Sequence, residues 1–152
     1  MTDHLFTVLQ RRIPPYLPTA VVVAGILYLS LHSFSDIPDN NLFRLPHLDK
    51  AVHFGMYFGL TATLWFDTAR HAAAKRKFPL RHLYRLWLLP VLLGGALEIA
   101  QALLTADRSG DIFDFLANTA GAAAGYLTGA RFIGPPIQTL TEKIKDKTEK
   151  NR

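Results

Sequence analysis

The sequence predicts an all-α protein, an integral membrane bundle of four transmembrane helices with the N- and C-termini cytoplasmic. Three observations predict this fold. The apolar residues are pooled into long segments, the basic residues fall in alternate connections, and the polar residues inside the segments gather at one end of the bundle. The 152 residues suffice for one domain. We expect the four-helix domain at residues 1–133 and a basic cytoplasmic tail at residues 134–152.

The composition excludes several classes of site. The chain has no cysteine, which excludes disulfide frameworks, thiolate zinc sites, iron–sulfur clusters and cysteine nucleophiles. Its mean hydropathy of +0.13 would suit a soluble protein. The membrane assignment therefore depends on how the apolar residues are distributed along the chain.

Four segments are apolar enough, or nearly so, to be membrane spans, for which about 20 residues are needed. Residues 16–31 carry no charge, and residues 86–104 carry only Glu98. Residues 51–66 and 112–133 have polar residues at their first ends only, as expected of spans packed inside a bundle. The first segment lacks an A-x-A-like cleavage site, so we interpret it as a retained anchor and not a signal peptide. Pro90 removes one backbone hydrogen bond from the third segment.

The basic residues indicate the orientation of these spans. Of the 17 Lys and Arg residues, 14 lie before the first segment, between the second and third segments, or after the fourth segment. Arg70 is counted among those between the second and third segments. Cytoplasmic connections of membrane proteins are enriched in Lys and Arg. We therefore interpret the net charge of +5 as a topology signal that faces anionic membrane lipids, and we expect no nucleic-acid partner.

The tail and the small residues predict further packing. Ile137, Leu140 and Ile144 lie at helical spacing among charged residues, which suggests an interfacial amphipathic helix, although a solvated charged tail fits equally well. Small residues recur every fourth position in the fourth segment and in the second, and they predict close helix contacts. They are Ala117, Gly121, Gly125 and Gly129, with Gly55 and Gly59.

Polar residues form stripes at the predicted outer end of the bundle, and ionisable residues inside a span usually mark a site. Each stripe follows helical spacing. The candidate ligand-binding residues are Asp49, Lys50, His53 and Tyr57 in the second segment, Glu98 and Gln101 in the third, Arg108 in the connection, and Asp111, Asp114 and Asn118 in the fourth. From the helical rise, His53, Gln101 and Asp114 lie about 5 Å below the helix ends, and Tyr57, Glu98 and Asn118 about 10 Å.

This cluster has three interpretations. His53 beside Asp114 or Glu98 can accept a proton, which makes these three the candidate catalytic residues. Lys50 and Arg108 at the rim can bind a phosphate or carboxylate. Alternatively, the side chains only hydrogen-bond to one another between helices.

Some of the same residues are also possible metal ligands. Asp49, His53, Glu98 and Asp114 could supply oxygen and nitrogen ligands. The cluster contains one histidine and no H-E-x-x-H motif, so the sequence predicts no metal and no cofactor.

These residues resemble the signature of the VanZ-like family of bacterial membrane proteins. The similar motifs are D-K-x-x-H-F-x-x-Y at residues 49–57, E-x-x-Q at residues 98–101 and R-x-x-D-x-x-D-x-x-x-N-x-x-G at residues 108–121. Their order and spacing together are more specific than any one motif. The similarity extends over residues 49–129.

The resemblance implies a small multi-pass protein of the bacterial inner membrane. The family is named for a member associated with low-level resistance to the glycopeptide teicoplanin, so the resemblance implies a role in the cell envelope and in antibiotic resistance. It also implies that the polar residues form a functional constellation. It supplies no reaction.

The expected function is therefore binding of an anionic lipid-linked or cell-envelope precursor in an outward-facing polar pocket, and an effect on susceptibility to teicoplanin-type glycopeptides would follow from the family resemblance. The alternative is a membrane-embedded hydrolase or transferase that acts on a lipid headgroup with His53 as general base, so enzyme activity stays open. A proton carrier is disfavoured because the inner halves of the spans, such as residues 60–66 and 86–93, lack ionisable groups. Expected partners are membrane lipids and such a precursor or a glycopeptide-related ligand, and the sequence identifies no protein partner.

Overall fold

The computed structural model describes residues 13–32, 48–71, 84–104 and 111–150, and all regular structure within them is helical. The α-helices are α2 (Leu17–Leu31), α3 (Leu48–His71), α5 (Leu89–Leu104), α6 (Ile112–Thr128) and α7 (Gly134–Lys150). Two short π-helical segments, η2 (Tyr84–Leu88) and η3 (Gly129–Ile133), precede α5 and α7. The prediction of an all-α protein is confirmed.

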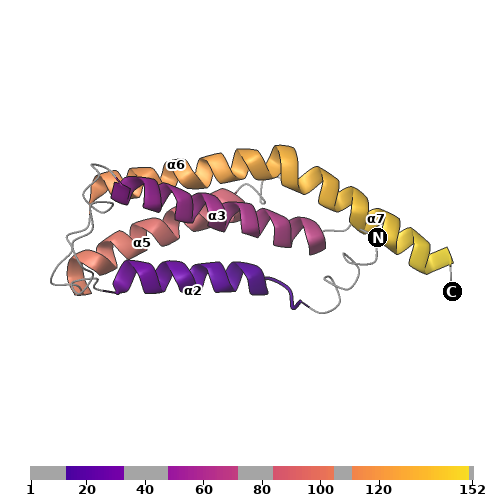
Figure 1. Cartoon of the computed structure of the whole chain (residues 1–152), viewed down its shortest axis with the longest axis horizontal. Helices are drawn as coiled ribbons and strands as arrows, with labels where there is room; N and C mark the ends of the chain where they lie inside the picture. Colours follow the sequence, from indigo (N-terminus) through magenta and orange to yellow (C-terminus); the bar gives the residue numbers. More distant parts are fainter. Residues whose placement is uncertain (1–12, 33–47, 72–83, 105–110, 151–152) are drawn as a thin grey trace.

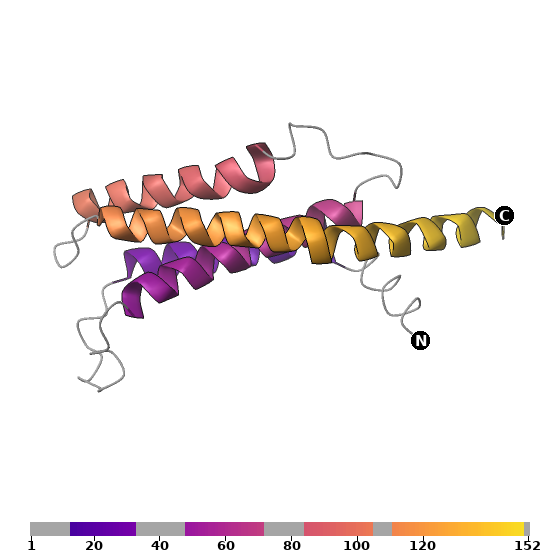
Figure 2. The same cartoon turned by 90° about the horizontal axis from the view of Figure 1, so that it is seen from above.

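Helices α2, α3, α5 and α6 lie side by side, and successive helices run in opposite directions (Figures 1 and 2). They coincide with the four apolar segments, although α3 is longer than predicted at both ends. A small apolar core joins all four helices. Its buried members are Ile26, Tyr57, Leu60, Leu97 and Ala122.

The predicted tail helix is present as α7, but it is not separate from the fourth segment. Helices α6, η3 and α7 follow one another without a break, and α7 extends beyond the other four helices (Figure 1). Pro135 and Pro136 therefore do not end the helix. They come directly after the π-helical turn, where the Gly134 N–H already bonds to the Gly129 carbonyl and not to the α-helical partner. Thr141 on α7 is buried, so the first half of α7 still belongs to the packed structure.

A second π-helical turn lies at the start of the third segment. Pro90 is the second residue of α5 and has no N–H to donate to the Leu86 carbonyl. The π-helical segment η2 includes Leu86, so the irregular winding lies where the proline removes an α-helical hydrogen bond.

The closest helix pair is α3 and α6, and glycines on α6 make it possible. A Cβ at Gly121 would overlap the Phe54 carbonyl, and one at Gly125 would lie 2.6 Å from the Phe58 carbonyl oxygen. Gly129 lies equally close to the Trp65 ring. The predicted glycine contact is thus confirmed on α6.

The glycines of α3 behave differently. A Cβ at Gly55 or Gly59 would meet no described atom within 4 Å. These two glycines therefore take no part in close helix packing within the described chain.

The opposite end of the bundle holds a buried ion pair that the sequence interpretation did not include. Arg70 lies 2.8 Å from Asp67, and both side chains are fully buried. The Thr19 hydroxyl and backbone N–H both donate to Asp67, and Arg70 donates to the Pro14 carbonyl. Placing Arg70 in a solvated connection was therefore wrong, because α3 continues to His71, more than a turn beyond its apolar segment. Polar residues gather at both ends of the bundle and not at one.

Among the described residues, Tyr84–Leu104 is the one helical stretch long and apolar enough to cross a membrane. Leu17–Leu31 is apolar but shorter. Helix α3 carries the charged residues Asp49, Lys50, Asp67 and Arg70, which lower its mean hydropathy. By length and composition alone, a core helix of a soluble protein would also resemble Tyr84–Leu104.

The glycine packing predicts opposite effects for two identical substitutions. Gly121→Ala should destabilise the protein by about 1–3 kcal/mol, because the new methyl group overlaps the Phe54 carbonyl. Gly59→Ala should be neutral or stabilising by up to about 1 kcal/mol, because alanine favours the helix and meets open space. Thermal unfolding in detergent measures both, and equal melting temperatures for the two variants would contradict the packing.

Candidate functional site

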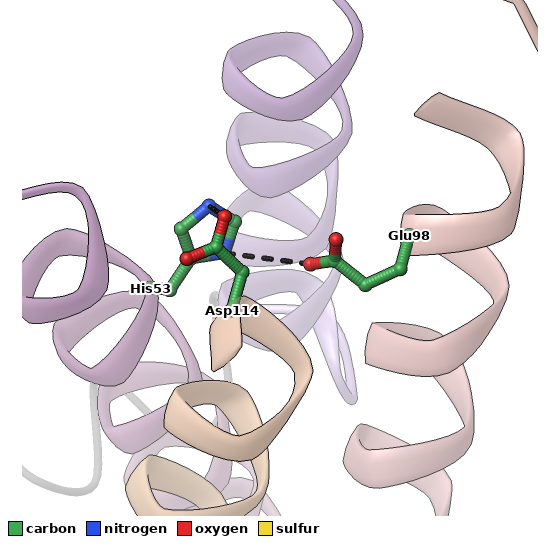
Figure 3. Close-up of side chains that lie close together, drawn as sticks. All are labelled: His53, Glu98 and Asp114. Carbon is green, nitrogen blue, oxygen red and sulfur yellow. Dashed lines mark ion pairs between the residues drawn. The ribbon is translucent and has the colours of Figure 1, made fainter. Parts of the chain in front are cut away.

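The candidate site lies at the end of the bundle where α3 and α6 begin and α5 ends. His53 on α3, Glu98 on α5 and Asp114 on α6 point toward one another (Figure 3). The His53 Nδ1 atom lies 3.8 Å from a Glu98 oxygen, and Nε2 lies 3.7 Å from Asp114 Oδ2. Three helices therefore supply the centre of the cluster, and the antiparallel order of the bundle brings these ends together.

Lys50 joins the outer part of the site. Its ammonium group lies 2.8 Å from Asp49, 2.9 Å from Asp111 and 3.0 Å from Asp114. These carboxylates belong to the first turns of α3 and α6, where the positive ends of the helix dipoles also favour negative charge. Lys50 is thus bound by three carboxylates, and it ties the start of α3 to the start of α6.

These contacts change the pKa values of groups that precede the apolar segments. Hydrogen bonds to Asp49, Asp111 and Asp114 raise the pKa of Lys50. The hydrogen bond from Lys50 lowers the pKa of Asp49. The Phe113 backbone N–H, followed by Lys50, lowers the pKa of Asp111. The rim is therefore held in its charged form.

Asn118 connects the two buried ionisable groups. Its amide nitrogen donates to Glu98 Oε1 at 3.2 Å, and its amide oxygen lies 3.0 Å from His53 Nδ1. Asn118, Glu98 and His53 are all buried. Since the amide nitrogen is used by Glu98, the amide oxygen must accept from His53, which places the proton of a neutral imidazole on Nδ1.

Asp111 and Glu98 fix the start of α6 against α5. The Asp111 side chain caps α6 by accepting from the Phe113 N–H at 2.8 Å. The Asp111 backbone N–H donates to Glu98 Oε2 at 3.1 Å. Both oxygens of Glu98 are therefore engaged by α6, one at its first residues and one at Asn118.

Two described candidate residues lie outside this network. Gln101 donates to the Ser30 carbonyl at 2.8 Å, so it links α5 to α2. The Tyr57 ring is buried in the core, and its hydroxyl has no hydrogen-bond partner among the residues that the structure describes. Arg108 lies outside the described residues. The other seven candidates form one connected network.

The two predicted polar layers are not separate, because side-chain length joins them. Glu98 reaches both the first residue of the α6 cap and Asn118, two turns further along. Ser30 and the Asp67–Arg70 pair were not among the predicted polar partners. The i, i+3 spacing of opposite charges at the end of an apolar segment is the signal that could have identified Asp67 and Arg70.

Two groups of side chains have the spacing of metal ligands. In each group, one ligand atom per residue lies within 4.8 Å of the others. One group is His53, Glu98 and Asp114, and the other is Asp49, Asp111 and Asp114. In the second group, the Lys50 ammonium already contacts all three carboxylates.

The Lys50 network predicts a pH dependence of stability. The folded pKa values of Asp49 and Asp111 lie below 3.8, so their stabilising effect is complete above the unfolded value of about 3.9 and is lost as the pH falls through the folded values. Lys50→Met should lower the melting temperature at about pH 6. Between about pH 6 and pH 3 the melting temperature of the variant should fall less than that of wild type, because the carboxylates have already lost their Lys50 partner. Thermal unfolding measures this, with Lys143→Met on α7 as control. Parallel pH curves for wild type and Lys50→Met would contradict the assignment.

Comparison with known proteins identifies the family. A model of the VanZ/LLP1 family matches residues 8–133, which include all ten candidate residues and leave out residues 1–7 and the tail. Neither a curated protein nor a solved structure gives a significant match. The match agrees with the resemblance seen in the three sequence motifs, and the chain belongs to the VanZ/LLP1 family.

Proposed function

We propose that this protein is a multi-pass protein of the bacterial inner membrane whose four antiparallel helices, α2, α3, α5 and α6, all cross the bilayer. Its exterior supports this, because large apolar side chains from several helices face outward. Val21, Ile99, Phe113, Leu127 and Phe132 are each at least 62% exposed. So much exposed apolar surface suits lipid better than water.

The proposed orientation places both termini in the cytoplasm. An even number of spans brings the two termini to one side, and 14 of the 17 basic residues fall on that side. The end that carries His53, Glu98 and Asp114 then faces outward, toward the cell envelope.

The absence of cysteine makes this orientation directly testable. We expect a membrane-impermeant maleimide to label Leu104→Cys in intact spheroplasts, because this exposed residue lies at the outer end of α5. Thr139→Cys on α7 should be labelled only after lysis. The reverse pattern would overturn the orientation, and labelling of both residues before lysis would contradict termini on the cytoplasmic side.

The outward cluster binds, in this proposal, the headgroup of an anionic lipid-linked cell-envelope precursor. The observation that carries it is the gradient of burial across one connected network. The Asp49 side chain at the rim is 58% exposed, whereas Glu98 at the centre is 10% exposed. A polar group that enters from the rim would thus meet fixed donors and acceptors. An effect on susceptibility to teicoplanin-type glycopeptides would follow from sequestering such a precursor.

The alternative is a hydrolase or transferase that acts on a lipid headgroup. The orientation of the His53 imidazole favours this alternative. When His53 is neutral, the Asn118 oxygen accepts the Nδ1 proton, so Nε2 carries the lone pair of a general base. Binding and catalysis would use the same atoms, and only turnover distinguishes them.

Native mass spectrometry of the gently extracted protein tests the binding proposal. We expect wild type to carry a specific lipid or headgroup mass, which the His53→Ala/Glu98→Gln double variant loses because both buried polar anchors are removed. Glu142→Gln on α7 makes the same chemical change outside the cluster and should keep the mass.

Thermal unfolding of the same proteins separates binding from packing. A folded double variant that keeps the lipid mass would overturn the binding proposal, as would wild type that carries no such mass. Loss of a headgroup from the bound lipid, dependent on His53, would favour the enzyme.

A further inference from the structure

When His53 is neutral, its imidazole faces Asp114 without a positive charge between the two groups. Asn118 holds the proton of neutral His53 on Nδ1, which leaves the lone pair of Nε2 directed at Asp114 Oδ2 from 3.7 Å. Two acceptors that face each other repel. The distance also exceeds the 2.7–2.9 Å or so of a hydrogen bond from an imidazolium to a carboxylate.

The charges of the described cluster residues also indicate a deficit of positive charge. Asp49, Asp111, Asp114 and Glu98 supply four carboxylates, and Lys50 is the one ammonium group among the described members of the cluster. With neutral His53 and ionised carboxylates the net charge is −3. Lys50 lies against Asp49, Asp111 and the Oδ1 atom of Asp114. Asp114 Oδ2 and Glu98, deeper in the bundle, have no contact with that ammonium.

The spacing of the inner group suits one shared ion. Metal–ligand bonds to histidine nitrogen and carboxylate oxygen are about 2.0–2.2 Å long, so two atoms that share an ion lie about 3–3.6 Å apart. The ligand atoms of His53, Glu98 and Asp114 lie within 4.8 Å of one another, and Nε2 lies 3.7 Å from Asp114. Glu98 lies 3.8 Å from Nδ1, so its carboxylate would have to turn toward Nε2 to complete the set.

Asn118 supplies the support that a metal-binding histidine requires. The second ring nitrogen of such a histidine usually donates to an oxygen that fixes its tautomer and direction. Asn118 Oδ1 accepts from Nδ1, and the same amide donates to Glu98. One buried side chain therefore orients two of the three ligands.

We propose that His53, Glu98 and Asp114 bind one divalent cation of the zinc or manganese class. A nitrogen ligand favours these ions over magnesium and calcium, which prefer oxygen alone. His53, Glu98 and Asp114 can be recognised from the sequence as possible oxygen and nitrogen ligands, but one histidine and two carboxylates on three separate helices form no metal-binding motif. Three protein ligands leave a coordination position open.

The cation would also resolve a conflict in the proposed function, on which this further step rests. Among the described residues of the cluster, an anionic headgroup would otherwise meet four carboxylates and one lysine that is already bound. A divalent cation would offset two of the three excess negative charges and present its open position to a phosphate oxygen. The outer acidic group would keep Lys50 as its cation.

Metal binding is tested on the full chain in detergent after treatment with EDTA, with Zn²⁺, Mn²⁺ or Mg²⁺ added alone. We expect one Zn²⁺ or Mn²⁺ per chain by elemental analysis after desalting, and no retained Mg²⁺. His53→Gln and Asp114→Asn should weaken binding at least about 10-fold, and Asn118→Leu about 10- to 100-fold as a positioning residue. Glu142→Gln should bind as wild type does. Absence of a retained ion in wild type, or unchanged binding in folded His53→Gln, would overturn the site.

Nuclear magnetic resonance of ¹⁵N-histidine-labelled wild type tests the site without a variant. We expect Zn²⁺ to shift the Nε2 resonance of one histidine whose Nδ1 keeps its proton. A His53 ring protonated on both nitrogens and unaffected by Zn²⁺ would overturn the proposal, because an imidazolium would then supply the missing charge.

Separate additions distinguish this inference from the proposed function. Inorganic phosphate and vesicles that contain phosphatidylglycerol are added to the Zn²⁺-loaded and the metal-free protein. Tighter binding of either anion with Zn²⁺ supports both proposals, and the two probes distinguish free phosphate from a lipid headgroup. Zn²⁺ binding with no gain for either anion upholds the cation site and overturns the headgroup role. Anion binding by a protein that binds no Zn²⁺ upholds the headgroup role and overturns the cation site.

Discussion

The close approach of α3 and α6 is the constraint on which the rest of the structure depends. Gly121 and Gly125 let the backbone of α6 lie against the carbonyls of Phe54 and Phe58, where no side chain would fit. This contact brings the first turns of both helices together. Lys50 can then reach the carboxylates of both helices, and His53 can reach Asn118. The candidate site is thus a consequence of how two backbones pack.

Polar groups between apolar helices must find partners, and this requirement is met differently at the two ends of the bundle. Asp67 and Arg70 form a fully buried pair that Thr19 completes, so these two opposite charges offset each other. A buried pair of this kind is costly to break, since removing one partner leaves an unpaired charge. The described residues at the other end are partly exposed and include more carboxylates than cations. The first arrangement suits a structural link between α2 and α3, and the second suits a ligand.

Asn118 shows how one neutral side chain decides the chemistry of charged neighbours. Its amide can donate on one side and accept on the other, and here it donates to Glu98 and accepts from His53. The direction of that amide places the imidazole proton and so leaves Nε2 free for a proton or a metal ion. Binding, general-base catalysis and metal coordination are therefore three uses of one atom. A histidine spectrum identifies metal coordination, whereas turnover distinguishes binding from catalysis.

The sequence by itself determined the all-α class, the positions of the four apolar segments and seven residues that form one polar network, because apolar runs and i, i+3 stripes follow from helix geometry. Membership of the VanZ/LLP1 family also agrees with the motifs. Only the tertiary structure decided which side chains meet. Gln101 and Glu98 share one stripe of α5, yet Gln101 contacts Ser30 and Glu98 contacts Asn118. It also placed Arg70 in the interior and joined α6 to α7. The physical reason is that helical spacing defines a face of one helix, whereas a contact depends on the distance and rotation of its neighbours, which packing alone sets.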